Sequence, residues 1–273
     1  MLDELNDAII AKDVKNAHIK LDELSIQKSK LESSKAKRSK TKAAKYSTIT
    51  EEEVERLIEE YYEADIDELY EEFVKKTKSL WKTLSEEEKI VLTKYTETYT
   101  YLNERLRGQT YLGGRSLSEF KNDLSILTDI LNRASIHRNI IVRRGVTNFN
   151  IPEISKRLDE LTVGDEFTEG GFLSTGLHRN KGFHPEYEFR IIIPKGSKGI
   201  FAEPFSHYND ENEKYTFEGT LWNGIDKQEY GHEFEWIGQR GSRFRVVRVE
   251  GKTIYLEMIS QLNEVIDLDS IVR

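Results

Sequence analysis

Side chains that bind anions or carry protons stand in four short stretches of the chain. In chain order, these stretches are Arg143-Arg144-Gly145, Phe172-Leu173-Ser174-Thr175-Gly176, Phe189-Arg190-Ile191 and Glu233-Phe234-Glu235. Guanidinium groups bind phosphate through paired hydrogen bonds. Glu233 and Glu235 lie two residues apart, so both carboxylates face the same side if they belong to a strand. The residue types therefore allow phosphate binding by arginine, and charge stabilisation or proton transfer by glutamate.

Each of these stretches, taken alone, has an ordinary structural explanation. An arginine beside a glycine at a strand end usually forms a surface ion pair, and Ser-Thr within a strand usually reflects β propensity. Most Glu-x-Glu pairs are simply solvated. Because four such stretches follow one another in order, a single functional site is the stronger interpretation. The six histidines show no metal-ligand spacing, and the lack of cysteine excludes thiolate chemistry and cysteine-bound metals.

Helices are expected to precede the strands that carry these stretches. Apolar residues recur at helical spacing from Ile49 onward, and again after Ser85, which forms a capping-box pattern with Glu88. We expect this second helix to end at Gly108, and a third helix to span Leu117 to Leu131. The expected apolar faces are Val54, Leu57, Ile58, Tyr61, Tyr62, Leu69, Tyr70 and Phe73; Val91, Tyr95, Leu102 and Leu106; and Leu117, Phe120, Leu124, Leu127 and Leu131.

From Asn139 onward, short runs of β-branched and aromatic residues alternate with glycine, proline and asparagine. The runs predicted as strands are 139–146, 170–177, 187–196, 199–205, 232–239, 242–250 and 253–259. Few helices are needed between them, so an antiparallel or mixed sheet is favoured over a doubly wound parallel sheet. The predicted class is α+β: a domain of residues 49–273, with N-terminal helices at 49–135 followed by a compact β core at 136–262.

Composition and charge narrow the classes of protein. The 273 residues carry a net charge of −8, which argues against general nucleic-acid binding. No apolar run is long enough to span a membrane, and the first residues lack the pattern of a secretory signal peptide.

Residues 1–48 are expected to be a helical and basic extension or linker. Apolar residues from Ile10 to Leu31 form a heptad pattern of about three repeats, as in half a coiled coil or a helix docked on another subunit. The basic run at 28–45 is either a solvated linker or a contact with nucleic acid or an acidic protein.

Taken together, the motifs resemble the arginine-type ADP-ribosyltransferase exoenzymes of the Arg / Ser-Thr-Ser / Glu-x-Glu class. This class includes the enzymatic subunits of binary bacterial toxins and domains of phage minor head proteins. The resemblance runs from about Trp81 to about Glu250, and its segments are TLSEEEKIVLTKYTETYTYLNERLRG, IIVRRGV, GDEFTEGGFLSTGL, FRIIIPKGSKGIFAEPFS and EFEWIGQRGSRFRVV. It implies the ADP-ribosyltransferase fold, and transfer of ADP-ribose from NAD to a protein arginine with release of nicotinamide.

The resemblance also implies a role for each catalytic candidate. Glu235, the second acid of the pair, is implied as the essential residue that stabilises the oxocarbenium-like charge on the ribose. Ser174 is implied to orient Glu235 through a hydrogen bond. Glu233 is implied to hold the incoming guanidinium and to help remove its proton. In the family, glutamate at this position accompanies arginine acceptors.

Arginines are the expected ligands of the NAD pyrophosphate, and Arg144 and Arg190 are the candidates. Arg144 is preferred over Arg143, because alternation along a strand lets only one of the two face NAD. Other NAD-binding positions implied by the resemblance are Gly145, Thr175, Asn103, Tyr95 and Phe183. With no P-loop or Rossmann glycine pattern in the chain, NAD is expected as a substrate, without a metal.

Two features depart from the toxin subunits. Gly176 stands where the third serine of the motif is usual, which removes one hydrogen bond. The aromatic-rich segment 204–233 is longer than in the toxins and looks more like the phage head domains. It is either a surface excursion packed by its own aromatics or a surface that recognises the acceptor.

Two alternatives to the transferase use the same residues. One is an NAD glycohydrolase, in which water takes the place of the acceptor protein. The other is a catalytically silent structural module of a phage head, against which the intact Arg144, Ser174, Glu233 and Glu235 argue. The expected partners are NAD and an acceptor protein, with docking to a virion or toxin partner through the N-terminal helix and no membrane. The expected location is a virion, or the cytoplasm of a host or target cell.

Overall fold

The structure, a computed structural model, describes residues 44–63, 66–108, 114–151, 153–177, 186–202, 206 and 235–262. They belong to one unit, residues 42–273. The heptad pattern, Phe183, Glu233 and the aromatic segment from 207 to 233 lie outside the described residues, as does the side chain of Tyr70.

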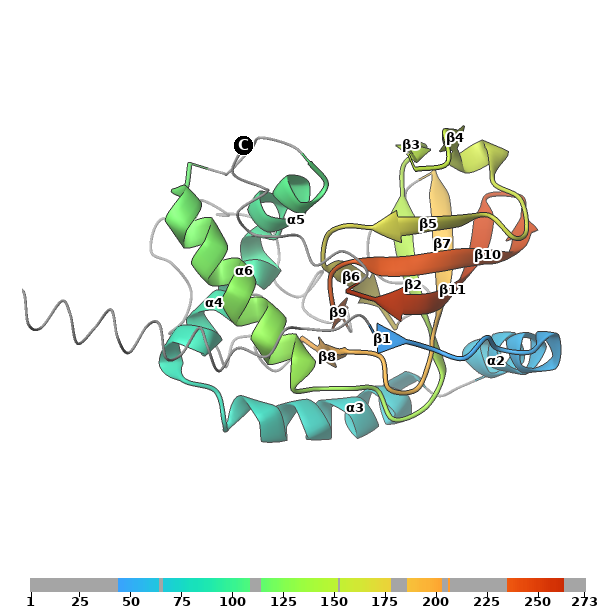
Figure 1. The fold of residues 1–273 in the computed structure, drawn as a ribbon. Helices are drawn as coiled ribbons and strands as arrows, with labels where there is room; N and C mark the ends of the chain where they lie inside the picture. Colours follow the sequence, from blue (N-terminus) through green and yellow to red (C-terminus); the bar gives the residue numbers. More distant parts are fainter. Residues whose placement is uncertain are drawn as a thin grey trace, which may run out of the picture. The chain divides into compact units, whose positions relative to one another are not determined.

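Helices occupy the first half of the described chain, as predicted (Figure 1). They are α2 (Glu51–Glu63), α3 (Ile66–Trp81), α4 (Glu86–Thr98), α5 (Thr100–Leu106) and α6 (Leu117–Asn132). Ser85 caps α4 through a capping box with Glu88, which confirms the sequence pattern. The single helix expected to run to Gly108 is instead two helices, because the chain turns at Tyr99 between α4 and α5. Tyr62, expected on a buried face, is 46% exposed.

The strands form a mixed sheet in the order β5-β10-β11-β7-β2-β6-β9-β8, and β1 pairs with β11. Every pairing is antiparallel except that of β11 with β7, which is parallel. The α+β class with a mixed sheet is therefore confirmed. The strands of this sheet are β1 (Ala44–Lys45), β2 (Ile140–Val146), β5 (Glu166–Glu169), β6 (Leu173–Gly176), β7 (Tyr187–Ile193), β8 (Gly199–Phe201), β9 (Glu235–Gly238), β10 (Ser242–Glu250) and β11 (Thr253–Gln261). A separate small pair consists of β3 (Asn150–Ile151) and β4 (Lys156–Arg157).

The sheet has two parts that meet at one point. β2 and β6 share a single register pair, Arg143 with Gly176, whereas β2 and β7 pair along their whole length. We call this meeting point the junction. It separates a large part, made of β5, β10, β11, β7 and β2, from a small part, made of β6, β9 and β8. Apolar side chains from both parts, among them Val142, Phe189, Leu173 and Trp236, pack into one central core.

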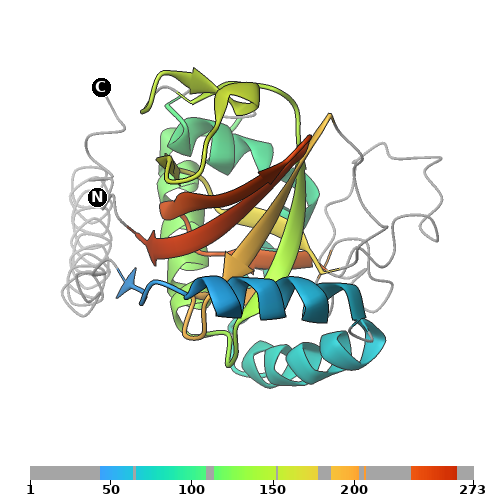
Figure 2. The ribbon, with the colours of Figure 1, turned by 90° about the vertical axis from the view of Figure 1, so that its right-hand side faces the viewer.

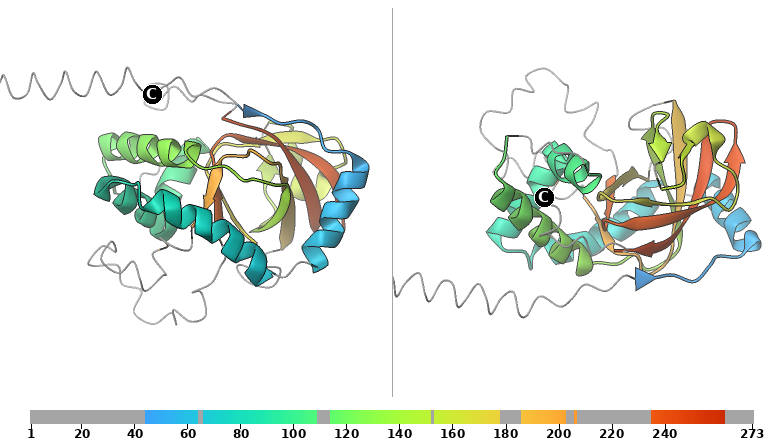
Figure 3. Two further views of the ribbon diagram at one scale, coloured as in Figure 1. Left: turned by 90° about the horizontal axis from the view of Figure 1, so that it is seen from below. Right: turned by 45° about the horizontal axis from the view of Figure 1, so that its top comes forward.

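Helices cover the outer faces of the two parts. Val54, Leu57 and Tyr61 of α2 pack on Ile141 and Ile192 of the large part; Figure 2 shows α2 crossing in front of these strands. Helices α4, α5 and α6 cover the small part through a second apolar cluster, and Figure 3 shows them grouped on that side. The small part is thus held between the central core and the helices.

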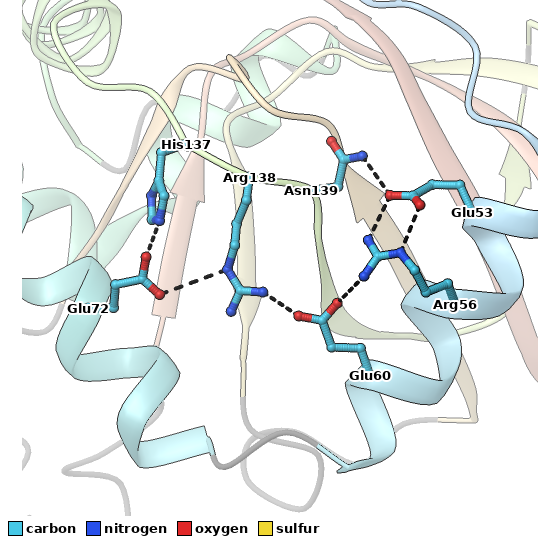
Figure 4. Close-up of polar contacts among 7 residues, drawn as sticks. All are labelled: Glu53, Arg56, Glu60, Glu72, His137, Arg138 and Asn139. Carbon is cyan, nitrogen blue, oxygen red and sulfur yellow. Dashed lines mark hydrogen bonds and ion pairs between the residues drawn. The ribbon is translucent and has the colours of Figure 1, made fainter.

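A polar network fixes α2 and α3 to the segment that leads into β2 (Figure 4). Arg138 pairs with Glu60 of α2 and with Glu72 of α3, and His137 also contacts Glu72. Asn139 donates a hydrogen bond of 3.1 Å to Glu53 of α2. Partly exposed ion pairs of this kind each contribute only about 0–1 kcal/mol. The network therefore links both helices to the start of β2 while adding little to stability.

Trp236, the neighbour of Glu235, is 1% exposed and anchors β9 in the central core. Its ring lies over Gly238 of β9 and over Gly199, the register partner of Gly238 on β8. A Cβ atom added to Gly238 would come within 2.5 Å of the indole ring, and one added to Gly199 within 2.4 Å. Only glycine fits at either position without a shift of Trp236.

We expect the substitution Gly238→Ala to lower the free energy of unfolding by about 1–3 kcal/mol, because it overpacks the core against the indole. Denaturant unfolding measures this loss. The smaller ring in the double variant Trp236→Phe/Gly238→Ala relieves the clash, so its loss is smaller than the sum of the two single losses. Additive losses would contradict this explanation.

Candidate active site

All four candidate stretches meet at the junction, since Arg143 on β2 is also the register partner of Arg190 on β7. Arg143 on β2 pairs with Gly176 on β6, and Gly176 pairs in turn with Glu235 on β9. The three residues form one row across three strands that are far apart in sequence. The arginine, serine and glutamate stretches are therefore brought together by the register of the sheet.

Ser174 and Glu235 lie on the same face of the small part. Glu235 is opposite Gly176, and Ser174 lies two residues before Gly176 on β6. Ser174 and Glu235 are therefore diagonal neighbours, with Cα atoms about 7–8 Å apart. Thr175 and Trp236 point to the opposite face, into the central core. There the Thr175 hydroxyl donates a 3.0 Å hydrogen bond to the carbonyl oxygen of Trp236, which fixes β6 against β9.

Two side chains of the covering helices reach this face from α4 and α5. The Tyr95 hydroxyl lies 3.1 Å from Ser174 Oγ, and Asn103 Nδ2 donates a 3.1 Å hydrogen bond to the same phenol oxygen. Both residues are buried. The backbone comes close to Asn103 at Gly171, where an added Cβ would lie 2.8 Å from Asn103 Oδ1. The two glycines before Phe172 thus allow β6 to approach α5.

The charges of Glu235 and Arg144 both act on the Tyr95 phenol. Burial raises the pKa of Tyr95, and the negative charge of Glu235 raises it further. Hydrogen bonds with Ser174 and Asn103 and the positive charge of Arg144 act in the opposite direction. Tyr95 therefore keeps its proton at neutral pH, beside both Glu235 and Arg144.

Arg144 shares a carboxylate with an arginine from the end of α5. Arg107 holds Glu169 through two hydrogen bonds, 2.8 Å from Nε and 2.9 Å from a terminal nitrogen, and Arg144 lies 3.4 Å from Glu169 Oε2. Burial raises the pKa of the Glu169 carboxyl, but the charges of Arg144 and Arg107 outweigh this effect and the net shift is downward. Glu169 is therefore ionised at neutral pH, and two guanidinium groups share its one negative charge.

Arg143 belongs to a different cluster on the other face of β2. Arg143 donates a 3.0 Å hydrogen bond to Glu188, and Arg190 donates one of 2.7 Å to the other oxygen of the same carboxylate. Arg190 also donates to the Tyr255 hydroxyl at 2.6 Å and lies among the rings of Tyr61, Tyr62 and Tyr255. Neighbouring residues of a strand face opposite sides, which explains why Arg143 and Arg144 separate.

This arrangement can be compared with known proteins. The family model described as ADP-ribosyltransferase exoenzyme matches residues 70–258, more than half of the chain. The chain belongs to the ADP-ribosyltransferase exoenzyme family. A comparison with curated proteins finds no match.

Solved structures of two ADP-ribosyltransferase toxins have a similar fold. Plx2a from Paenibacillus larvae is 19% identical with a TM-score of 0.51, over 72% of this chain and 96% of that chain. BECa, from a binary enterotoxin of C. perfringens and solved with NADH, is 17% identical with a TM-score of 0.52, over 72% of this chain and 49% of that chain. At these identities the likeness establishes the fold, and it confirms the predicted ADP-ribosyltransferase architecture.

Within the ADP-ribosyltransferase fold, the structure distributes the predicted site residues over three places. Tyr95, Asn103, Ser174 and Glu235 gather where the helices cover the small part of the sheet, and the charge of Arg144 on β2 acts on the Tyr95 phenol. A second group consists of Arg143 and Arg190 on Glu188, with Gly145 opposite Glu188 in the register. Thr175 lies in the central core.

The sequence interpretation did not include Arg107 and Glu169, which the structure connects to the candidate residue Arg144. Arg107 lies four residues after Asn103, a spacing that puts both side chains on the same side of a helix. That spacing was the one signal available for Arg107. No comparable signal in the sequence indicates Glu169, because its partners come from the end of α5 and from β2.

Neither a metal cluster nor a membrane span is found in the part of the chain that the structure describes. No three His, Cys, Asp or Glu side chains gather there as ligands of a metal ion. The helices described there are also too short or too polar to cross a bilayer.

Proposed function

We propose that this ADP-ribosyltransferase cleaves NAD at the bond between nicotinamide and ribose, and transfers the ADP-ribose to an arginine side chain of a protein. The observation that carries the proposal is the row of Arg143, Gly176 and Glu235, which brings the arginine, serine and glutamate motifs to one junction. Glu235 lies beside Ser174 and Tyr95 on a face covered by helices.

The reaction follows from the charges at this site. As the bond from ribose C1′ to nicotinamide breaks, its electron pair leaves with nicotinamide, and positive charge develops on the ribose ring. The Glu235 carboxylate stabilises that charge. A guanidinium nitrogen of the acceptor then bonds to C1′, and Glu233 takes the proton that this nitrogen loses. Glu233 has this role on the ground of the motif, since it lies outside the described residues.

The arginine clusters suit the pyrophosphate of NAD. In each, two guanidinium groups meet one carboxylate: Arg107 and Arg144 share Glu169, and Arg143 and Arg190 share Glu188. A surplus of positive charge attracts phosphate, and an arginine has five N–H donors to offer. We assign the first cluster to the pyrophosphate, because the charges of both Arg144 and Glu235 act on the Tyr95 phenol.

We expect Arg144→Lys to raise the KM for NAD about tenfold, because lysine keeps the charge but loses the planar pair of donors. The matched variant Arg143→Lys, at the neighbouring position on the opposite face, should change KM by about twofold at most. Steady-state NAD hydrolysis measures both. The reverse order of effects would reassign the pyrophosphate to the cluster of Arg143 and Arg190.

The acceptor is tested with NAD labelled on the adenylate part, incubated with the purified protein and a bacterial lysate. Labelled proteins, with ADP-ribose found on arginine by mass spectrometry, support the proposal. ADP-ribose on another residue type overturns the arginine assignment, and free ADP-ribose without labelled protein supports a glycohydrolase. Intact NAD overturns the proposal as a whole. Docking through residues 1–48 and the place of action, virion or cell cytoplasm, stay predictions from the sequence.

A further inference from the structure

We propose that Tyr95 is a positioning residue that fixes the direction of a hydrogen-bond chain from Asn103 through Tyr95 to Ser174, so that the Ser174 hydroxyl proton is directed to the Glu235 carboxylate. The inference rests on the proposed function, in which Glu235 stabilises the charge on the ribose. It gives Tyr95 a different role from the NAD contact that the family resemblance implies, because its side chain is fully buried at 0% exposure.

The chain begins with the fixed orientation of the Asn103 amide. Asn103 Oδ1 accepts a 2.8 Å hydrogen bond from the backbone N–H of Phe172, and Nδ2 donates to the carbonyl oxygen of Phe172 at 3.1 Å. A flipped amide would place N–H against N–H and oxygen against oxygen. Nδ2 must therefore be the group that faces Tyr95, and an amide nitrogen can only donate. The phenol oxygen of Tyr95 thus acts as the acceptor of this bond.

The second step follows from the single proton of the phenol. Because the phenol is buried, its proton needs an acceptor; Asn103 Nδ2 cannot accept, so the proton goes to Ser174 Oγ, which lies 3.1 Å away. Burial raises the pKa of Tyr95, so this donor persists throughout the neutral range. The ring is held edge-on against Phe172 with centroids 5.6 Å apart, which keeps the hydroxyl in place.

The third step concerns the proton of Ser174. A hydroxyl that already accepts a bond from Tyr95 has its one proton left to donate. Glu235 is the carboxylate on the same face of the adjacent strand, and its charge acts on the Tyr95 phenol. A carboxylate held by such a donor keeps one orientation toward the ribose, whereas an unguided hydroxyl could equally turn toward Tyr95. Tyr95 therefore acts on turnover through Ser174, without contact with NAD.

The test is a double-mutant cycle of Tyr95→Phe and Ser174→Ala, measured by NAD hydrolysis. We expect each single variant to lower kcat about tenfold with the KM for NAD changed less than about twofold. The double variant should be no slower than Ser174→Ala, because Tyr95 acts only through that hydroxyl. The matched control is Tyr101→Phe, which removes another buried phenol, bonded to Asp123 at 2.7 Å. It should lower the melting temperature while leaving kcat within about twofold.

Several results would overturn the inference. Multiplicative losses in the double variant would mean that Tyr95 acts independently of Ser174, and a rise in KM in place of a fall in kcat would make Tyr95 an NAD contact. A readout that does not depend on turnover is the NMR resonance of the Tyr95 hydroxyl proton, which we expect to shift in Ser174→Ala. An unchanged resonance refutes the hydrogen bond even if the wild type does not hydrolyse NAD, whereas a shifted resonance in an inactive wild type overturns only the proposed function.

Discussion

Replacing Glu235 with glutamine is expected to lower both NAD hydrolysis and ADP-ribose transfer by about a thousandfold. The side chain keeps its shape and can still accept the hydrogen bond proposed from Ser174, but it loses the negative charge that we assign to stabilising the ribose. Both reactions pass through cleavage of the same bond, so both should fall by the same factor. Release of nicotinamide and labelling of protein, measured in one incubation, give the two rates.

The matched control for this prediction is Glu186→Gln, a change of the same chemistry at a half-exposed carboxylate beside β7. It should leave both rates within about twofold, since a surface ion pair contributes little. If Glu235→Gln kept more than about a tenth of the wild-type hydrolysis, Glu235 would not be the group that stabilises the ribose.

The substitution Glu233→Ala is expected to separate the two activities. Transfer to arginine should fall about a hundredfold or more, because no carboxylate then holds the guanidinium or takes its proton. Hydrolysis should stay within about threefold, since water needs no such carboxylate once Glu235 has stabilised the ribose. The measurement uses a protein acceptor and, in parallel, NAD alone. Equal loss of both activities would refute this division of labour between the two glutamates.

Much of the β core could be predicted because most of its strands coincide with short runs of β-branched and aromatic residues. The run 242–250 became β10 with the same bounds, and the run 139–146 contains β2. β5 was not predicted, because residues 166–169 combine glutamates with threonine and are flanked by glycines. Its strand conformation comes from pairing with β10, which is a tertiary effect. The junction also has no local signal, because it depends on how β2 meets β6.

In the helical half, too, local motifs could be predicted but features without a local signal could not. Ser85 and Glu88 predicted the start of α4, because a capping box is a local sequence motif. The turn at Tyr99 could not be seen, because neither glycine nor proline marks it and the apolar spacing continues through it. Tyr62 fits the spacing of the buried face but is exposed, and its hydroxyl contacts Arg190.

For the site, the motifs indicated residues that the register of the sheet brings close, but not which of them share a cluster. The preference for Arg144 over Arg143 stays a prediction. Its support is that the two arginines have different carboxylate partners and that the charge of Arg144 lowers the pKa of Tyr95. The partnership of Arg107 with Glu169, and the burial of Tyr95 behind Ser174, depend on contacts between elements remote in sequence. Sequence spacing can place Arg107 on the same helix side as Asn103, but it does not reveal the partner from another element.

The single register pair at the junction has a consequence for how this enzyme can change over evolution. Few backbone hydrogen bonds tie β2 to β6, so we expect the volume of the core side chains from both parts of the sheet to influence the separation between Arg144 and Glu235. A substitution at a buried apolar position such as Leu177 or Phe201 alters that volume without touching a motif residue. We therefore expect core substitutions to alter the fit to the substrate while the candidate catalytic side chains stay the same.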